Sequence, residues 1–346
     1  MHGGDIYRNS IHFDFSVNIN PLGVPDQVQW VLTEAALHAN KYPDIIHEKL
    51  IKETAEKFDV IPEVVAYGNG ASELIMAICH GLMPKKAMLV QPCFSGYEKC
   101  IKGAAPGCRI INHVLTEADD FEIKEDILDK IQEEKPNLLF LTNPNNPNGR
   151  LIDPQLLDRI IEACENVGAT VVLDECFISL TGREKELSLT YRIRNYKSLI
   201  VLRAFTKSFA IPGVRIGYCI CSKRILCDSI KAHLPVWNLS IFAQMAGMEC
   251  LKLSDYVEDA VKVIKAEREY LTGELERLGF KVFTSDANFI LFKSQKTDLD
   301  KKLLDYSILI RNCNDYEGLT DGYYRIAIKM HNENEGLISA LEDICS

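Results

Sequence analysis

The chain has 346 residues, of which 47% are hydrophobic and 25% charged, as in an ordinary soluble globular protein with one large or two modest domains. A net charge of −10 argues against nucleic acid or an anionic membrane as partner, because both require a basic face. The chain has no run of about 18 apolar residues, and residues 1–8 lack the order of a signal peptide. We therefore expect a cytoplasmic protein with no membrane partner.

The twelve cysteines are scattered, form no Cys-x-x-Cys pair and often stand inside apolar runs. This pattern favours buried free thiols in a reducing compartment over disulfides. The eight histidines are dispersed and form no His-Glu-x-x-His motif, so we expect no metal site.

Short apolar runs alternate with amphipathic stretches between about Val64 and Leu202. This rhythm predicts an α/β fold with a mostly parallel sheet sandwiched by helices. The expected strands are Val64–Tyr67, Ala87–Val90, Arg109–Val114, Leu138–Leu141, Thr170–Leu173 and Leu199–Leu202, with helices at Ser72–Leu82, Lys124–Ile131 and Pro154–Val167.

The pattern changes after Asn238, where two helical stretches precede strands expected near Lys281–Thr284, Phe289–Lys293, Ile308–Arg311 and Tyr323–Ile328. The second helix is expected at Asp255–Leu278 with Ser254 as its N-cap, and it belongs to a smaller α+β domain. One helix before residue 40, at Asp26–Ala39, is expected to join that domain. The predicted division is residues 41–240 for the large domain, and residues 1–40 with 241–346 for the small one.

The segment Gly68–Met76 follows an apolar run and opens a helical pattern. Backbone N–H groups of Ala71 and Ser72 would form an anion site at the start of this helix. A dinucleotide fingerprint fits poorly, because Glu73 stands where the third glycine belongs, and no P-loop lysine is present. A plain strand-to-helix turn is the alternative.

Two further loops follow strands at the edge of the sheet where ligands bind. Phe94 stands on the first, where an aromatic ring either stacks on a flat cofactor or fills the core. Asn146 stands on the second between two prolines, which fix the backbone and set the direction of an amide hydrogen bond.

The next two strands end in Asp174 and, after the run Leu199–Leu202, in Lys207. A buried carboxylate needs a partner, which a protonated pyridine nitrogen provides, although a helix cap or a salt bridge would also serve. A lysine in apolar or cationic surroundings loses its proton more easily and can form a Schiff base. Thr206 and Arg215 stand close enough in sequence to hold a phosphate.

These residues together resemble the fold-type I pyridoxal phosphate enzymes, with an aspartate aminotransferase-like fold, within the class I/II aminotransferase superfamily. The resemblance runs nearly end to end and is to the branch of histidinol-phosphate aminotransferases and threonine-phosphate decarboxylases, the latter being more similar. The motifs that carry it are His2–Gly4, Asp14–Gly23, Tyr42–Asp44, Ala71–Glu73, Pro144–Pro147, Ile308–Cys313, Tyr316–Leu319 and Tyr324–Ile328.

The resemblance implies a role for each matching position. Lys207 would be the Schiff-base lysine, Asp174 the pyridinium partner and Asn146 the donor to the ring hydroxylate. The remaining cofactor-binding positions would be Gly70, Ala71, Ser72, Phe94, Thr206, Arg215 and, from the other subunit of a homodimer, Tyr42.

Substrate contacts are also implied. Arg325 matches the arginine that pairs with the α-carboxylate of the substrate, a role suited to its forked guanidinium. A substrate phosphate would be met by Arg325, His2 and Asn20, while Gly3 and Gly4 allow close approach.

Phe177 stands where aminotransferases commonly have a tyrosine, and the decarboxylases also have phenylalanine there. The reading we favour is therefore decarboxylation of L-threonine O-3-phosphate, of the cobalamin-pathway type, to 1-aminopropan-2-yl phosphate. The alternative is a histidinol-phosphate-type aminotransferase. A non-catalytic binding module of the same fold is a lesser alternative, since Lys207 and Asp174 are both present. No motif reports which bond at Cα is broken.

Overall fold

A seven-stranded sheet forms the centre of the structure, which is a computed structural model that describes residues 3–346. Six of its strands run in the same direction, whereas β8, between β2 and β7, runs antiparallel to both of its neighbours. In spatial order the strands are β2 (Val65–Gly68), β8 (Gly217–Cys221), β7 (Leu199–Ala204), β6 (Thr170–Asp174), β5 (Leu138–Thr142), β3 (Lys86–Gln91) and β4 (Arg109–Val114).

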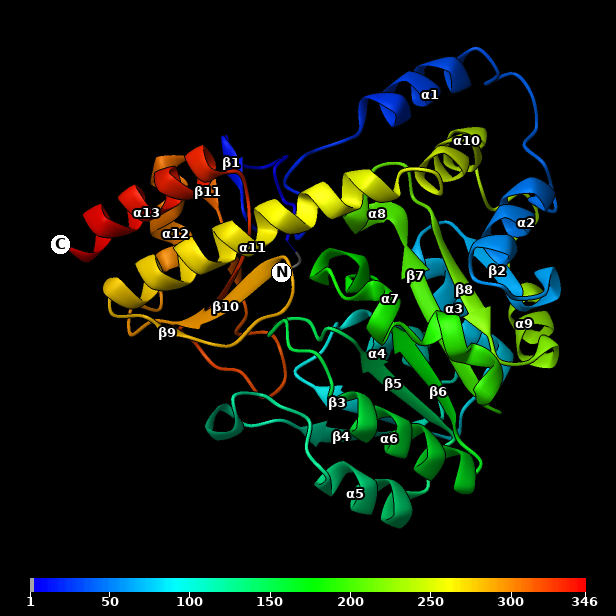
Figure 1. The fold of residues 1–346 in the computed structure, drawn as a ribbon. Coiled ribbons are helices and arrows are strands. Elements are labelled where there is room, and N and C mark those ends of the chain that lie inside the picture. The colour runs from blue at the N-terminus through cyan, green and yellow to red at the C-terminus, as the bar shows by residue number, and fades with distance from the viewer. Residues whose placement is uncertain (1–2) are drawn as a thin grey trace.

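Helices cover both faces of this sheet (Figure 1), as expected for strands that read as continuous apolar runs. Helix α3 contacts both α4 and α9, and α5 and α6 form a separate pair. The helices of this part are α2 (Glu48–Lys57), α3 (Ala71–Leu82), α4 (Gly96–Ala104), α5 (Asp126–Glu134), α6 (Pro154–Asn166), α7 (Glu184–Leu187), α8 (Phe205–Ser208), α9 (Arg224–Lys231) and α10 (Ile241–Cys250).

A smaller unit is built on a four-stranded antiparallel sheet with its own hydrophobic core. Its longest helix, α11 (Ser254–Arg277), runs from the seven-stranded part into this unit (Figure 1). The other elements are β12 (Arg311–Asn312), β13 (Tyr323–Ala327), β10 (Phe289–Lys293) and β9 (Lys281–Val282), the parallel pair β1 (Phe13–Asp14) and β11 (Ile308–Leu309), and helices α12 (Leu299–Lys302) and α13 (His331–Cys345).

The predicted fold class is confirmed, and three details differ. Strand β8 is absent from the sequence-based prediction, because its five residues directly follow a glycine-containing return. Ser254 is the first residue of α11, and Leu253 is its N-cap. The predicted strand Ile308–Arg311 is split between β11 and β12, which pair with different partners.

The N-terminal residues contribute to both cores. Helix α1 (Asp26–Ala36) contacts α10, and its Val28 is buried in the core of the seven-stranded part. Phe15, by contrast, is buried in the core of the smaller unit. The proposed domain boundaries stay a prediction.

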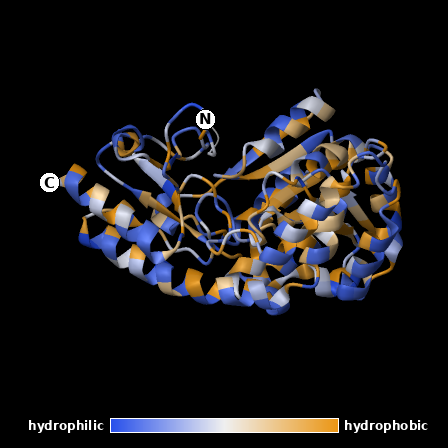
Figure 2. Ribbon diagram, turned by 90° about the horizontal axis from the view of Figure 1, so that it is seen from above, coloured by the Kyte–Doolittle hydropathy of each residue, from blue (hydrophilic) through white to orange (hydrophobic). Residues whose placement is uncertain are grey.

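Burial follows the hydropathy of the chain. Hydrophobic residues concentrate in the inner strands, while the outer helices alternate hydrophobic and hydrophilic positions (Figure 2). The twelve cysteines are free, and ten of them are buried, as predicted. Within residues 3–346, no helix is long and apolar enough to cross a membrane, and no cluster of three or more His, Cys, Asp or Glu could hold a metal ion.

Candidate active site

A cavity of about 270 Å³ contains Lys207 and lies at the carboxyl ends of the central strands. It brings together side chains that are far apart in the sequence, because the parallel strands end at the same edge. The predicted site residues that line it are Gly3, Ala71, Ser72, Phe94, Asn146, Asp174, Thr206, Lys207, Arg215 and Arg325.

Other predicted site residues do not line this cavity. Asn20 donates from Nδ2 to the carbonyl oxygen of Ser208 at 2.8 Å, and its N–H bonds the carbonyl oxygen of Lys207 at 2.9 Å. These two hydrogen bonds fix the backbone of the turn that carries Lys207. The N–H of Gly4 donates to Ser16 Oγ at 2.8 Å. Tyr42 is 80% exposed and its ring centroid lies 4.8 Å from that of Trp237. His2 lies outside the described residues.

Lys207 is placed by the short helix α8, which follows β7 directly. Burial lowers the pKa of its ammonium to about 8, and the nearby guanidinium of Arg325 contributes to that shift. Its Nζ lies 5.7 Å from the ring centroid of Phe177. An amine held in this way loses its proton close to neutral pH and can attack a carbonyl carbon.

Asp174 is held by two hydrogen bonds at the end of β6 and is 7% exposed. Tyr97 Oη donates to its Oδ2 at 2.7 Å, and the N–H of Cys176 donates to its Oδ1 at 2.9 Å. Tyr97 also exchanges a hydrogen bond with Thr142 Oγ1 at 2.9 Å. The carboxylate is thus oriented beside the cavity, where a cationic ring nitrogen would be its partner.

An anion cradle is formed where α3 begins. Gly70 has φ +78°, and a Cβ on it would lie 2.5 Å from Arg215 Nη2, so the guanidinium packs directly on this glycine. Arg215 Nη1 donates to the carbonyl oxygen of Pro212 at 3.0 Å. Ala71 and Ser72 are the first residues of α3, whose unpaired N–H groups favour an anion.

Arg325 joins this cavity to the smaller unit. Its Nη1 donates to Asn146 Oδ1, and its Nη2 donates to the carbonyl oxygen of Ser16 at 2.8 Å. Its Nε and the Oδ1 of Asn18 are buried and have no hydrogen-bond partner in the described part of the chain. Because buried polar groups are rarely left unpaired, these two atoms indicate where a bound ligand makes contacts.

The cavity is also lined by residues that the sequence-based site prediction does not include, among them Asn18, Tyr97, Arg311 and Tyr316. Arg311 is the cross-strand partner of Arg325, so the two side chains stand on the same face of the sheet. Both oxygens of Asp315 accept from Arg311 Nη2, at 2.7 and 2.9 Å. The signal available in the sequence was one arginine within each of two apolar stretches. The strand register that places these two arginines opposite each other follows only from the fold.

The donor set of this cavity fits pyridoxal phosphate. The anion cradle at Gly70 and Arg215 suits its phosphate, Asp174 suits its ring nitrogen, and Phe94 contributes an aromatic side chain to the cavity lining, which suits its ring. Gly96 leaves room for that aromatic side chain, since a Cβ there would lie 2.1 Å from Phe94 Cε1. When bound, the cofactor withdraws electrons from the bond that breaks at Cα of an amino acid.

Comparison with curated proteins supports this assignment. The chain is 33% identical over 336 residues to the threonine-phosphate decarboxylase of Salmonella typhimurium, covering 96% of this chain and 90% of that protein. It is 33% identical to a histidinol-phosphate aminotransferase of Caldanaerobacter subterraneus, covering 96% and 93%. It is 34% identical to the adenosylcobalamin biosynthesis bifunctional protein CobDQ of Leptospira interrogans, of which it spans 41%.

Solved structures agree on the fold. The histidinol-phosphate aminotransferase of Clostridium acetobutylicum superposes with a TM-score of 0.89 at 34% identity, over 96% of this chain and 99% of that one. The complex of the Sinorhizobium meliloti histidinol-phosphate aminotransferase with pyridoxal-5'-phosphate superposes with a TM-score of 0.85 at 20% identity, over 95% and 89%. The family described as aminotransferase class I and II matches residues 10–341. The chain therefore belongs to this family, and it is an enzyme that uses pyridoxal phosphate.

Proposed function

We propose that this enzyme decarboxylates L-threonine O-3-phosphate to 1-aminopropan-2-yl phosphate. The observation that carries the proposal is the pair of guanidinium groups, Arg311 and Arg325, on one face of the small sheet and in the cavity of Lys207. Two such groups match a small amino acid that carries both a carboxylate and a phosphate. The relatives whose names include threonine phosphate support the same substrate.

The substrate contacts follow from this pairing. Arg325, with its unpartnered Nε, would hold the α-carboxylate, and Arg311 would meet the phosphate. The Oδ1 of Asn18 would accept from the substrate ammonium. His2, Gly3 and Gly4 stay candidates for the phosphate. Gly3 lines the cavity, and a Cβ there would lie 2.4 Å from the carbonyl oxygen of Ser16, so only glycine fits at that point.

Phe177 favours loss of CO2 over transamination. It lines the cavity and packs edge-on against Phe289, with ring centroids 5.1 Å apart. It offers no hydroxyl to a ligand, so it cannot donate a hydrogen bond to an oxygen on the cofactor ring. After the bond between Cα and the carboxylate has broken, a proton must return to Cα, and Lys207 Nζ is a group in the cavity that can deliver it.

The second candidate function is transamination of the histidinol-phosphate type. It is favoured by the 34% identity and the TM-score of 0.89 to the Clostridium acetobutylicum enzyme. Its dicarboxylate co-substrate, 2-oxoglutarate, would also present two anionic groups to Arg311 and Arg325, whereas histidinol phosphate would present only its phosphate.

The two reactions are separated by their products. Purified protein loaded with pyridoxal phosphate is incubated with L-threonine O-3-phosphate, and CO2 and 1-aminopropan-2-yl phosphate are measured. The same protein is incubated with histidinol phosphate and 2-oxoglutarate, and glutamate is measured. We expect product in the first reaction only. Glutamate without CO2 would establish the aminotransferase instead, and the variant Lys207→Ala is the blank for both.

We further propose a homodimer in the cytoplasm in which Tyr42 reaches the cavity of the other subunit. Tyr42 is 80% exposed in the single chain and does not line the cavity of its own chain. Large apolar side chains near it in sequence are also exposed, namely Trp30, Leu37, Ile45 and Ile46. An exposed apolar group of this kind is typical of a protein interface. The free cysteines fit a reducing compartment.

Mixed dimers test the shared site. Tyr42→Ala and Lys207→Ala are each prepared, unfolded together and refolded in equal amounts. If Tyr42 acts across the interface, half of the molecules are mixed dimers with one intact site each, so about a quarter of all sites recover. If Tyr42 serves its own subunit, the mixed dimers contain no intact site and no activity returns above the sum of the separate variants.

A further inference from the structure

A second cavity, of about 530 Å³, lies on the other side of α8 from the cavity of Lys207. Phe205 and Ser208 of this short helix line the second cavity, whereas Thr206 and Lys207 line the first. No residue predicted from the sequence to bind cofactor or substrate lines the second cavity. Its volume is in the range of small-molecule sites, which is about 300–1,000 Å³.

The pleat of the central strands explains why two cavities share one edge of the sheet. Successive side chains at a strand end point to opposite faces. Asp174 therefore faces the cavity of Lys207, whereas the next residue, Glu175, faces Arg203 on the neighbouring strand with an N–O distance of 3.5 Å. Arg203 in turn lines the second cavity.

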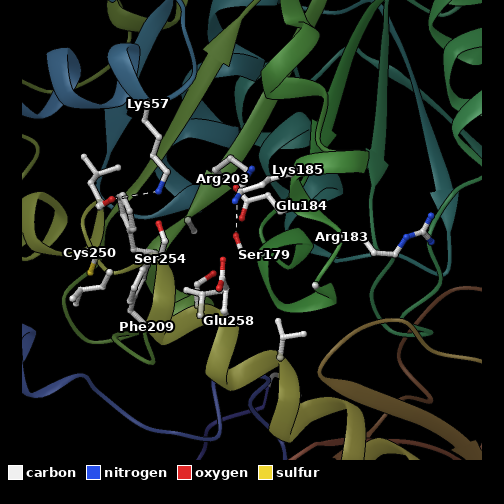
Figure 3. A pocket seen from close by; sticks show the side chains of 18 of the residues that line it. Lys57, Ser179, Arg183, Glu184, Lys185, Arg203, Phe209, Cys250, Ser254 and Glu258 are labelled. Atoms are coloured by element: carbon white, nitrogen blue, oxygen red, sulfur yellow. Dashed lines mark hydrogen bonds and ion pairs between the residues drawn. The ribbon is translucent and has the colours of Figure 1, made fainter.

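The charges at the base of the second cavity compensate one another. Arg203 Nη2 donates to Glu184 Oε1 at 2.7 Å and to Ser179 Oγ at 2.8 Å, and Arg203 Nη1 donates to Ser188 Oγ at 3.1 Å. Figure 3 shows Arg203, Glu184 and Ser179 converging beside the open space. Arg203 and Glu184 each have a hydrogen-bond partner within this network, so the network does not require a ligand.

Lys57 is different, because it enters the cavity from α2 without a carboxylate partner. Its Nζ contacts the carbonyl oxygen of Leu251 at a long 3.4 Å, and no carboxylate of residues 3–346 lies within ion-pair distance. The surrounding protein desolvates the ammonium and lowers its pKa; nearby Glu184 opposes that shift, and Arg203 adds to it. Lys52 on the same helix has Glu56 at 3.9 Å. Lys57 is thus an exposed lysine with no carboxylate of the described residues within ion-pair distance, and Glu184 is the nearby negative charge.

The walls around Lys57 are largely apolar. They combine an aromatic side, contributed by the sheet and α8, with an aliphatic side from α11. The residues are Phe58, Phe205, Phe209, Tyr218, Val257 and Val261. These side chains form one apolar part of the cavity, which fits the apolar body of a ligand.

The remaining charged side chains favour an anion over a cation. Five cationic and three anionic side chains line the cavity, although the whole chain has a net charge of −10. Arg183 points away from the other labelled residues in Figure 3 and forms an ion pair with Glu186. Glu258, on α11, is the one carboxylate lining this cavity that has no hydrogen bond or ion pair within the described residues. It is therefore the group that would attract a cation to the cavity.

We propose that this second cavity is a binding site for a small organic anion with an apolar body, whose anionic group contacts Lys57 and whose body lies against the aromatic wall. The ligand would rest on the back of the helix that carries Lys207. The proposal does not depend on which reaction the enzyme catalyses.

Three probes with the same apolar body and different charges test which charge the second cavity prefers. They are 4-phenylbutyrate, 4-phenylbutan-1-ol and 4-phenylbutylamine. Each is titrated into the pyridoxal phosphate-loaded protein by calorimetry, with ligand-observed NMR as a second readout. We expect the anion to bind more tightly than the alcohol, and the alcohol more tightly than the amine.

Matched variants locate the binding. Lys57→Met should weaken the anion about tenfold or more, because it removes a contact between charged groups. Lys52→Met, on the same helix, should leave the affinity unchanged. Ser254→Phe fills the cavity from an exposed position at the start of α11, and it should abolish binding of all three probes. Thermal unfolding verifies that each variant is folded.

Four results would overturn the proposal. They are equal binding of the anion to wild type and Lys57→Met, tightest binding of the amine, no binding of any probe, and loss of anion binding in Arg325→Lys. The last result would place the anion in the cavity of Lys207 instead.

Discussion

Tyr97 Oη donates a 2.7 Å hydrogen bond to Asp174 Oδ2, which ties α4 to the end of β6 beside the cavity. Tyr97 is 1% exposed and its ring stacks on Phe140 with centroids 4.7 Å apart, so the hydroxyl cannot move away from the carboxylate. The bond therefore orients Asp174 for a cationic partner.

Tyr97→Phe should weaken the binding of pyridoxal phosphate about tenfold, because one hydrogen bond to a charged group is lost. Titration of the cofactor-free protein, followed by absorbance, measures this change. Tyr324→Phe is the matched control, since the hydroxyl of this buried tyrosine also makes two hydrogen bonds, but to backbone groups of the smaller unit. An unchanged cofactor affinity in Tyr97→Phe would contradict this role.

The pKa of Lys207, which burial lowers to about 8, determines how cofactor uptake depends on pH. Only the neutral amine attacks a carbonyl carbon, so the uptake rate should rise about tenfold per pH unit below pH 8 and level off above it. An ordinary lysine would level off above pH 10.

Arg325→Gln should move this plateau to higher pH, because the positive charge of Arg325 lowers the pKa of Lys207. The rate of cofactor uptake is measured by stopped flow for both proteins. Any ionisation of the free cofactor affects both rates equally, so it does not contribute to the difference between the two pH profiles. Arg159→Gln, at an exposed position that pairs with Glu125, is the control. A plateau at the same pH in Arg325→Gln would show that desolvation alone sets the pKa.

The roles of Arg311 and Arg325 should be distinguishable by comparing two substrates, threonine phosphate and threonine. Arg325→Lys is expected to lower kcat/KM for threonine phosphate and for threonine alike, because both have an α-carboxylate. Arg311→Lys should lower it about a hundredfold for threonine phosphate and little for threonine, since a bidentate contact to phosphate is lost. Equal effects of Arg311→Lys on both substrates would exclude the phosphate contact.

Phe177→Tyr should shift the ratio of transamination to decarboxylation upward about tenfold, the effect of one hydrogen bond to a charged oxygen. The added hydroxyl would be positioned in the cavity, close to the side of the cofactor ring. Product analysis by chromatography gives both rates from one incubation. Phe209→Tyr, which lines only the second cavity, is the control and should leave the ratio unchanged.

Gly70→Ala should lose both stability and cofactor affinity. Its φ of +78° strains an alanine by about 1–2 kcal/mol, and the new Cβ would displace Arg215 from the phosphate cradle. Gly23→Ala is a matched control, because φ is +83° there and nothing lies within 4 Å of the added Cβ. Thermal unfolding should detect both substitutions, whereas cofactor titration should detect only Gly70→Ala.

The sequence by itself determined the fold class and most of the cofactor site. The strands β3, β5, β6 and β7 are continuous apolar runs, and a residue after such a run has a known place at the edge of a parallel sheet. That is why Asp174 and Lys207 could be assigned from local pattern together with the family resemblance.

Only the tertiary structure decided which further groups meet them. Tyr97 reaches Asp174 across 77 residues, and Arg311 meets Arg325 through the register of two short antiparallel strands, which no local pattern encodes. The role of Asn20 also depends on the fold. Its Nδ2 donates to the carbonyl oxygen of Ser208 across 188 residues, and the residue does not line the cavity. Burial, desolvation and strand register depend on the whole chain, so the lowered pKa of Lys207 and the position of Lys57 in the second cavity follow only from the folded protein.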